Sequence, residues 1–521
     1  MKILHRGAVG LLVCLLVSAG RAQETAKAVD LSLQDSIAQT IKNNLGVALQ
    51  VLNPQLSAAS VSRANERFLP TVSLSYGRQH TDSPSVSYVD AAGNLVTTAD
   101  NFTFVQASQA VPFGGTLNLS LTGSKTDQNR TGVLINPSYN TTLRFTFNQP
   151  LLRNFGYNVS RYSILIARNS LNVSDYQLRQ SLMDTVYNVE SAYWNLVYAI
   201  ENLKVREQSL ALAKDLLDKN QRSVEVGTLA PIEIVSAQAE VATREADLIQ
   251  AQTQVESASD QLKVLINMPE EEQRTAGLIR PTDSPSFAEH KVELDEALAS
   301  ALQNRPDLEI SKLGIEAQRL NLSYAKNQIL PDLNLSAGYW SPGVSGTKIF
   351  YVGNPIDNVI DHTVPGGIGQ AFSDTMRFKN NNWSLGLTLN LSAANIFSKA
   401  SVTQAKLAMR QSLLTLQNDQ QQVYLEIKNA VRNVDANFKR ITAYKAAREL
   451  AEQKLAAEEE KLKVGQSTNY MVLSYQRDLA TARISELNAI IAYNVSLAGL
   501  DRSMGASLKN RNISLTDAGQ Q

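Results

Sequence analysis

The residue types that most often carry chemistry in proteins are few in this chain, and they are widely spaced. Among the 521 residues there are four histidines, and no two of them have the spacing of metal ligands. The single cysteine, Cys14, lies in an apolar N-terminal stretch and cannot join them. The sequence has neither a Walker-type phosphate loop nor a dinucleotide-binding fingerprint. We therefore expect no metal site, no cofactor and no enzymatic activity.

Two further polar segments also have ordinary explanations. The glycines of residues 366–369 lie in a predicted loop without a flanking strand and helix, so a phosphate cradle is not expected there. The acids of residues 458–460 lie on a long predicted helix and are interpreted as a solvated face. Basic and acidic residues balance at 49 each, so no charge excess indicates nucleic acid as a partner.

The N-terminus has the pattern of a secretory signal peptide, predicted over residues 1–22. Lys2 and Arg6 form a basic start, an apolar run too short to cross a bilayer follows, and Ala22 ends a small-residue cleavage pattern. An N-terminal membrane anchor is the alternative. Cys14 follows Val13, which does not resemble a lipid-attachment box. An exported chain without disulfides must be stabilised by a large core, a membrane or an oligomer.

A repeated junction organises the rest of the chain. Residues 64–77 read ANERFLPTVSLSYG and residues 325–338 read AKNQILPDLNLSAG, with six identities in fourteen positions. Proline lacks a backbone donor and stops a helix, so each copy predicts a helix end followed by a strand. The helix-to-strand junctions are therefore predicted at Leu69-Pro70 and at Leu330-Pro331.

A second pair of matching segments lies further along each half of the chain. Val226-Gly227 corresponds to Val464-Gly465, and the residues that follow also align. An internal duplication of this length defines the fold as two copies of one unit. We expect a first repeat over residues 23–267, a linker over 268–292, a second repeat over 293–505 and a tail over 506–521.

Each repeat contains a helix far longer than those of globular proteins. Residues 157–226 lack glycine and proline, and as one helix they would span about 100 Å; the matching stretch is 394–464. Apolar residues in 4-3 spacing form a seam with a 3.5-residue period. We expect these helices to pack side by side into a sheet or tube, with a free coiled-coil rod as the alternative. The seam consists of Leu182, Val186, Val189, Tyr193, Leu196, Ile200 and Leu203.

Apolar and polar residues alternate in segments that follow or precede these helices. The segments are 71–79, 141–149, 332–340 and 383–391. Such alternation over ~9–11 residues is typical of a membrane β-strand, although a soluble sandwich strand alternates too. Residues 102–123 add strand-like alternation around a Pro-Phe-Gly-Gly turn, which indicates a further hairpin either within the barrel or outside it.

The number of predicted strands demands an oligomer. Four or six strands cannot close a membrane barrel, for which ~8 is the smallest number. An open sheet edge in lipid leaves backbone groups without hydrogen bonds, at a cost of several kcal/mol each. The chain must therefore share a barrel with copies of itself. Polar links at 80–100 and 341–382 are expected to be external loops.

The paired segments LPTVSLSYG and LPDLNLSAG, with VGTLAPIEIVSAQAEV and VGQSTNYMVLSYQRDL, resemble the TolC family of outer-membrane efflux proteins. The resemblance implies a mainly α fold with transmembrane β: a homotrimeric outer-membrane β-barrel, four strands per chain, continued by a long periplasmic α-helical barrel. It implies that the barrel lies in the outer membrane of a Gram-negative-type bacterium, in contact with the lipid of that membrane. A periplasmic adaptor and an inner-membrane pump or ABC exporter are the implied partners.

The resemblance also assigns two sets of site residues. The helix turns would contact the adaptor, and in the best-known members acids just beyond the second turn ring the periplasmic entrance. Those positions are Met471 and Ser474 here, so Glu233 of the first half is the one carboxylate considered for a gate, with an exposed helix acid as the alternative. The candidate adaptor contacts are Val226, Gly227, Thr228, Val464, Gly465 and Gln466.

These observations predict a passive exit duct of a tripartite efflux or secretion system. The alternative is a periplasmic adaptor or a coiled-coil scaffold. Adaptors usually have one long helical hairpin between soluble β-domains, whereas this sequence has two hairpins, each preceded by amphipathic strands. A duct lined by polar residues selects weakly, so the choice of cargo is expected to lie mostly with the partners.

Overall fold

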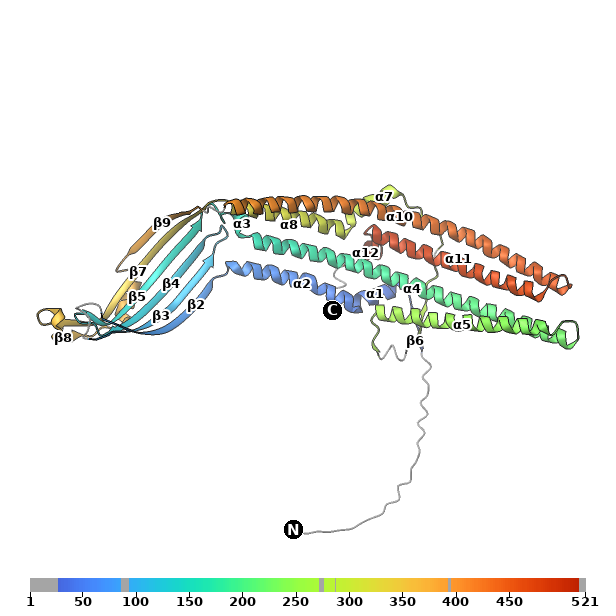
Figure 1. Ribbon diagram of the computed structural model, residues 1–521, viewed down its shortest axis with the longest axis horizontal. Helices are drawn as coiled ribbons and strands as arrows, with labels where there is room; N and C mark the ends of the chain where they lie inside the picture. The colour runs from blue at the N-terminus through green and yellow to red at the C-terminus, as the bar shows by residue number, and fades with distance from the viewer. Residues whose placement is uncertain (1–26, 86–92, 271–275, 286, 392–394, 515–521) are drawn as a thin grey trace, which may run out of the picture.

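The computed structural model describes residues 27–85, 93–270, 276–285, 287–391 and 395–514. The chain is elongated, with a β-sheet at one end and long helices over the remaining length (Figure 1). The predicted signal peptide at 1–22 lies outside the described residues, as do 271–275 and 286 of the linker and 515–521 of the tail.

Two long helical hairpins form the body of the molecule. In the first repeat α4 (Tyr162–Glu225) turns into α5 (Ile232–Leu265). In the second α10 (Asn395–Lys463) turns into α11 (Asn469–Ser503). At 1.5 Å per residue, α4 and α10 are each about 100 Å long, as the sequence predicts. Both turns lie at the end of the molecule opposite the sheet (Figure 1).

A pair of shorter helices precedes the strands of each repeat. In the first half α1 (Leu33–Asn43) and α2 (Leu45–Asn65) lead through η1 (Glu66–Phe68) into the sheet. In the second half α7 (Leu294–Asn304) and α8 (Pro306–Gln328) occupy the corresponding place. The helix order is thus repeated along with the sequence motifs. Two short helices, α3 (Tyr157–Ser160) and α12 (Ser507–Asn510), precede α4 and follow α11.

The 4-3 seam of α4 packs against several neighbours, which excludes a free coiled-coil rod. Tyr193 and Leu196 are fully buried, in one cluster with Ile37 of α1 and Leu262 of α5. Helix α4 also lies against α2, α8 and α11. Since one helix has partners on several sides, the helices form a laterally packed layer.

Seven of the described strands form one antiparallel sheet in which sequence neighbours are mostly spatial neighbours. Its order is β2-β3-β4-β5-β7. Strands β8 and β9 both pair with β7, β9 along its first part and β8 near its end. The strands are β2 (Thr71–Ser83), β3 (Leu95–Ala110), β4 (Thr116–Gln128), β5 (Ile135–Pro150), β7 (Asp332–Tyr351), β8 (Ile360–Val364) and β9 (Asn382–Asn390).

The expectation of four strands per chain is wrong. Among the described residues six strands have nine or more residues, because β3 and β4 are ladder members between β2 and β5. The segment 102–123 is therefore part of the main sheet and not a hairpin outside it. The predicted loops are also shorter than expected. Strand β2 reaches Ser83 and β7 reaches Tyr351, since backbone pairing continues beyond the apolar alternation.

The link between β7 and β9 contains structure of its own. It carries η2 (Pro355–Asp357), the strand β8 and a nine-residue helix, α9 (Ile368–Met376). Near the middle of the molecule β1 (Lys27–Leu31) pairs in parallel with β6 (Ala276–Pro281), which ties the start of the first repeat to the linker. Of the helices in the described part of the chain, none is both long enough and apolar enough to cross a bilayer.

Candidate functional site

Both predicted Leu-Pro junctions lie where helix becomes strand. Leu69 is extended and donates to the carbonyl of Glu66, so Pro70 follows the last helical turn directly. In the second half the Leu330 amide donates to the carbonyl of Asn327 in the same way. The Pro331 carbonyl then accepts from the backbone of Arg153 at 3.3 Å, which joins the two halves at this level.

One face of the sheet is almost continuously apolar. The register places Tyr339 opposite both Phe145 and Trp383, so the alternating large residues of neighbouring strands share one face. The side chains on this face include Leu117, Leu119, Leu121, Leu143, Phe145, Phe147, Leu333, Leu335, Leu385, Leu387 and Leu389. An apolar face of this kind can contact lipid.

The opposite face of the sheet is polar. Asn118 pairs with Thr146, and Ser336 with Asn148, in the intervening register positions. The Arg144 guanidinium lies over the Trp340 ring, 4.8 Å from its centroid. A sheet with one apolar and one polar face separates lipid from water when it closes into a wall.

The two helix turns at the far end have the same hydrogen-bond pattern. Thr228 donates to the Ser223 carbonyl at 2.9 Å while Gly227 donates to Val224. Gln466 and Gly465 repeat this pattern on α10, and the two glycines have φ of +77° and +75°. This is a Schellman cap, in which glycine adopts the left-handed conformation without steric cost.

The turns leave their apolar residues in solvent. The exposed fraction is 74% for Val226 and 69% for Val464, and Thr228 and Gln466 are exposed beside them. Two exposed, similarly shaped turns at one end of the molecule form a surface that can bind another protein.

The predicted gate residues lie on α5 and α11, just beyond the turns. The Glu233 carboxylate accepts a hydrogen bond of 3.4 Å from the side chain of Asn469, which is buried on α11. Met471 and Ser474 are half-buried on the same helix. Glu233 is therefore a contact between hairpins in the single chain, and more than a solvated helix acid.

A buried arginine, which the sequence patterns do not reveal, joins the hairpins more strongly. The Arg244 side chain of α5 is 5% exposed and donates to Glu240, to the Ser209 carbonyl of α4, and to Gln476 and the Leu473 carbonyl of α11. The nitrogen-to-oxygen distances are 2.7–3.3 Å. We call these residues the Arg244 cluster; Arg477 of α11 also bonds Glu240, at 3.0 Å.

The interpretation of residues 458–460 as a solvated face is wrong for one of them. Glu458 is buried, accepts a 2.6 Å hydrogen bond from the Ser467 hydroxyl, and pairs with Lys461. The carboxylate thus closes the turn after α10. These hydrogen bonds, led by that from Ser467, lower the pKa of Glu458 below its ordinary value.

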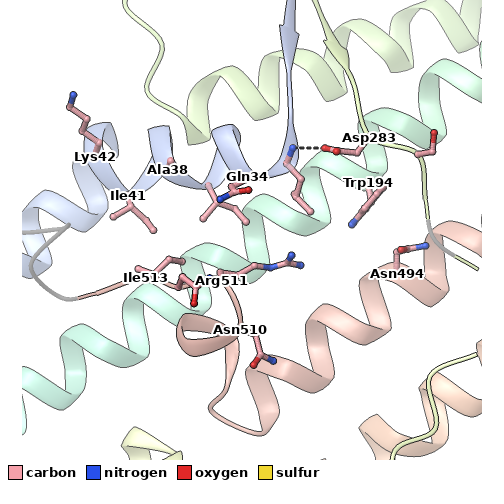
Figure 2. A pocket seen from close by; sticks show the side chains of 14 residues that line it. Gln34, Ala38, Ile41, Lys42, Trp194, Asp283, Asn494, Asn510, Arg511 and Ile513 are labelled. Atoms are coloured by element: carbon pink, nitrogen blue, oxygen red, sulfur yellow. Dashed lines mark hydrogen bonds between the residues drawn. The ribbon is translucent and has the colours of Figure 1, made fainter. Parts of the chain in front are cut away.

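A groove of about 870 Å³ lies near the middle of the molecule, between α1, α4, α11 and the chain after α12 (Figure 2). The Tyr193 hydroxyl beneath it contacts Asp283, which also accepts from the Leu33 amide at 2.6 Å. Burial, with Asp283 beside it, raises the pKa of Tyr193 to about 12. The groove lining contains Arg511, which bonds the buried Glu190 at 2.7 Å. Burial raises the pKa of Glu190, while Arg511 opposes that shift.

The described residues contain no group of three or more His, Cys, Asp or Glu side chains placed to hold a metal ion. His80 contacts the Thr98 hydroxyl and His362 contacts Asp361, far along the sheet from His290, whose amide donates to Tyr493.

A family model described as outer membrane efflux protein matches residues 105–268 and 297–506. Among curated proteins, the outer membrane protein TolC of Vibrio cholerae serotype O1 is 25% identical over 361 residues, covering 68% of this chain and 75% of that protein. TolC of Escherichia coli K12 is 22% identical over 366 residues, covering 70% of each.

Solved structures agree at the level of the fold. The outer-membrane channel OprN aligns with a TM-score of 0.66 and 14% identity, over 91% of this chain and 90% of that chain. The Campylobacter jejuni CmeC outer membrane channel aligns with a TM-score of 0.63 and 15% identity, over 93% and 90%.

Proposed function

The chain belongs to the outer membrane efflux protein family, and we propose that it is the outer-membrane exit duct of a tripartite efflux or secretion system. In this role it is a passive channel. The energy for transport would come from an inner-membrane pump or ABC exporter, reached through a periplasmic adaptor. Nothing in the geometry of the described residues calls for a catalytic step.

The observation that carries this proposal is a sheet with one apolar face, one polar face and two edge strands that lack a partner on their outer side. Within the described residues β2 pairs only with β3, and β9 only with β7. Unpaired strand edges in hydrocarbon are costly, so each edge needs a strand from another copy of the chain. Cyclic symmetry satisfies every edge at once, and a homotrimer is the assembly that the family relationship favours.

The strand count gives this barrel a specific size. Three copies of six long strands give eighteen strands, where four strands per chain would give twelve. Barrel diameter grows roughly linearly with strand number, so the outlet would be about half as wide again. Barrels of 16–18 strands leave an aqueous channel. The polar face, with Arg144 and Trp340, would line it.

The two Schellman turns are the proposed contact with the adaptor. Val226 and Val464 offer exposed apolar side chains, and the similar backbone shape of the turns would present two related sites per chain. A trimer would then present six such turns around its periplasmic end. Substituting Val226 and Val464 with Asp should abolish adaptor binding and leave the channel assembled.

We propose that the gate is the contact between hairpins at this same end. Glu233 with Asn469, and the Arg244 cluster about 16 Å further along α5, hold the tips of the two hairpins together. Met471 and Ser474 lie beside them without an acid. In a trimer three copies of Glu233 would come near the axis, as a cation-binding ring or as partners in inter-chain ion pairs.

The test is single-channel recording of the purified full chain in planar bilayers. We expect a heat-modifiable trimer with a conductance well above that of a twelve-stranded relative measured in the same salt. A protein recovered only as a soluble periplasmic monomer would refute the duct and support the alternative, an adaptor or coiled-coil scaffold. The two hairpins and the two-faced sheet weigh against that alternative.

A further inference from the structure

The helix α9 lies on the apolar face of the sheet. Its inward residues Ala371 and Thr375 are fully buried, and the Thr375 hydroxyl is 2.6 Å from the hydroxyl of Thr141 on β5. Thr141 shares its face with Leu143 and Phe145, because alternate residues of a strand point the same way. A Cβ on Gly343 of β7 would lie 2.0 Å from the Ala371 carbonyl, so that glycine is required for the helix to lie this close.

Aromatic rings form a row on either side of α9. On one side Tyr76, Phe102 and Phe104 follow one another with centroid distances of 5.1 and 6.0 Å, and Phe104 reaches Phe372 of α9 at 6.4 Å. On the other side Phe378, just after α9, lies 6.1 Å from Tyr339. Tyr339 in turn is paired with Trp383 of the edge strand β9.

The sheet itself has no large side chain in the middle of this row. The register aligns Phe102 of β3 with Gly123, Thr141 and Gly343 on the next three strands. A Cβ on Gly123 would lie 2.6 Å from the Phe104 ring, so the missing side chain makes room for that ring. Helix α9 therefore places Phe372 beside strand positions that have only small residues, and Phe378 after it extends the row to Tyr339.

The end of α9 is unusual in a way that supports a role for Phe378. The Phe378 amide donates to Thr375 and the Lys379 amide to Asp374, which is the same Schellman pattern as at Gly227 and Gly465. Phe378 occupies the position that is glycine in those turns, with φ of +49°. A left-handed conformation is sterically unfavourable for a residue other than glycine. A large aromatic side chain at a position that favours glycine suggests that the ring itself is needed.

We propose that α9 is an interfacial membrane helix that completes the aromatic belt of the barrel at the outer boundary of the bilayer. Barrels in outer membranes have aromatic girdles at both interfaces, because amphipathic rings favour the headgroup level. Phe372 and Met376 are one turn apart and form one flank of α9, and they are 39% and 37% exposed. The expected occupant of this flank is lipid, since it continues the apolar face of the sheet.

The opposite flank of α9 is polar. Gln370 is two positions from Phe372, which is about 200° around the helix, and it is exposed to solvent. Asp374 on that flank pairs with Lys379 at 3.2 Å. The division between apolar and polar flanks suits a helix lying in the plane of an interface.

The test measures lipid exposure with spin labels on the full chain in bilayers of phosphatidylcholine. Single cysteines replace Met376 on the apolar flank, Gln370 as the matched control on the polar flank, and Leu387 on the sheet. We expect the label at 376 to collide several-fold more with oxygen, relative to a water-soluble nickel chelate, than the label at 370. This inference rests on the proposed function, and the label at 387 tests that function separately.

The outcomes are distinct. A lipid-exposed label at 387 with equal chelate access at 376 and 370 would overturn the role of α9 alone. Protection of 376 from both reagents would show a protein contact and would also overturn it. A water-exposed label at 387 would overturn the membrane location of the sheet itself. In addition, Phe378→Gly should not lower the thermal midpoint in detergent, yet should reduce oxygen collisions at 376 as the helix leaves the lipid boundary.

Discussion

Removing the Arg244 guanidinium should loosen the periplasmic end of the channel. In Arg244→Ala, Gln476 and Glu240 lose a buried cationic partner, and the bonds to the carbonyls of Ser209 and Leu473 disappear. The ion pair with Glu240 lies within α5 and survives separation of the hairpins, so the cost to the contact comes from the two bonds of Arg244 to α11. A hydrogen bond to a charged group is worth about 1.5–3 kcal/mol, so about 3 kcal/mol is expected for the two together. Every 1.4 kcal/mol is tenfold, so the population with separated hairpins should rise ~100-fold.

The assay is the open probability and mean conductance of single channels in planar bilayers. Lys214→Ala is the matched control, because Lys214 pairs with Glu245 at 2.8 Å within the first hairpin and is half-exposed. An exposed pair of this kind is worth about 0–1 kcal/mol. Arg244→Lys should recover only part of the closed population, since an ammonium cannot reach four acceptors in a planar arrangement.

The reasoning would be refuted if Arg244→Ala channels opened no more often than Lys214→Ala channels. A heat-stable trimer on unboiled gels must be retained by both variants. If the Arg244→Ala trimer assembles normally and remains closed, the Arg244 cluster stabilises the helices without controlling the opening.

Three further predictions concern the turn and the middle of the molecule. Gly227→Ala should cost about 1 kcal/mol at its φ of +77°, seen as faster proteolysis at that turn while the trimer is retained. Tyr193→Phe should lower the thermal midpoint, because its hydroxyl makes hydrogen bonds of 2.8–3.2 Å beneath the groove. Burial raises the pKa of Glu190 despite Arg511, with Asp501 adding to the shift. The folded state is therefore stabilised by the protonated carboxyl at low pH, and this stabilisation is lost as pH rises through that pKa. The stability of Glu190→Gln relative to the native chain should therefore increase with pH across that range and then level off, as thermal unfolding from pH 4 to 8 would show; a flat difference would contradict this.

The sequence predicts the repeated part of the fold because its signals are local. The proline of each Leu-Pro pair and the glycine of each Val-Gly pair determine the backbone conformation at their own positions. The seventy residues 157–226, which lack both glycine and proline, likewise favour one uninterrupted helix. Pro70 and Pro331 lie directly before strands, and Gly227 and Gly465 follow the ends of helices. The long helices could be predicted from their apolar periodicity and the absence of helix breakers alone.

The remaining features depend on partners that are distant in sequence. Whether β4 joins the main sheet depends on its pairing with β3 and β5, and alternation at Leu117 and Leu119 is the same in either case. The burial of Arg244 depends on residues of α11 that lie 229 and 232 positions later in the chain. No pattern on an alanine-rich helix marks which arginine another helix will cover. Helix α9 is too short, in a glycine-rich link, to show a helical period.

The unequal division of strands between the repeats has a consequence for how such channels can change. Strands β2 and β7 follow the two Leu-Pro junctions, and β5 and β9 lead back to the long helices, so β3 and β4 are the surplus pair. A surplus hairpin begins and ends at the same rim, and the chain re-enters the helices as if the hairpin were absent. Evolution can therefore adjust the girth of the outlet by whole hairpins while the helices, and every surface at the opposite end, stay unaltered.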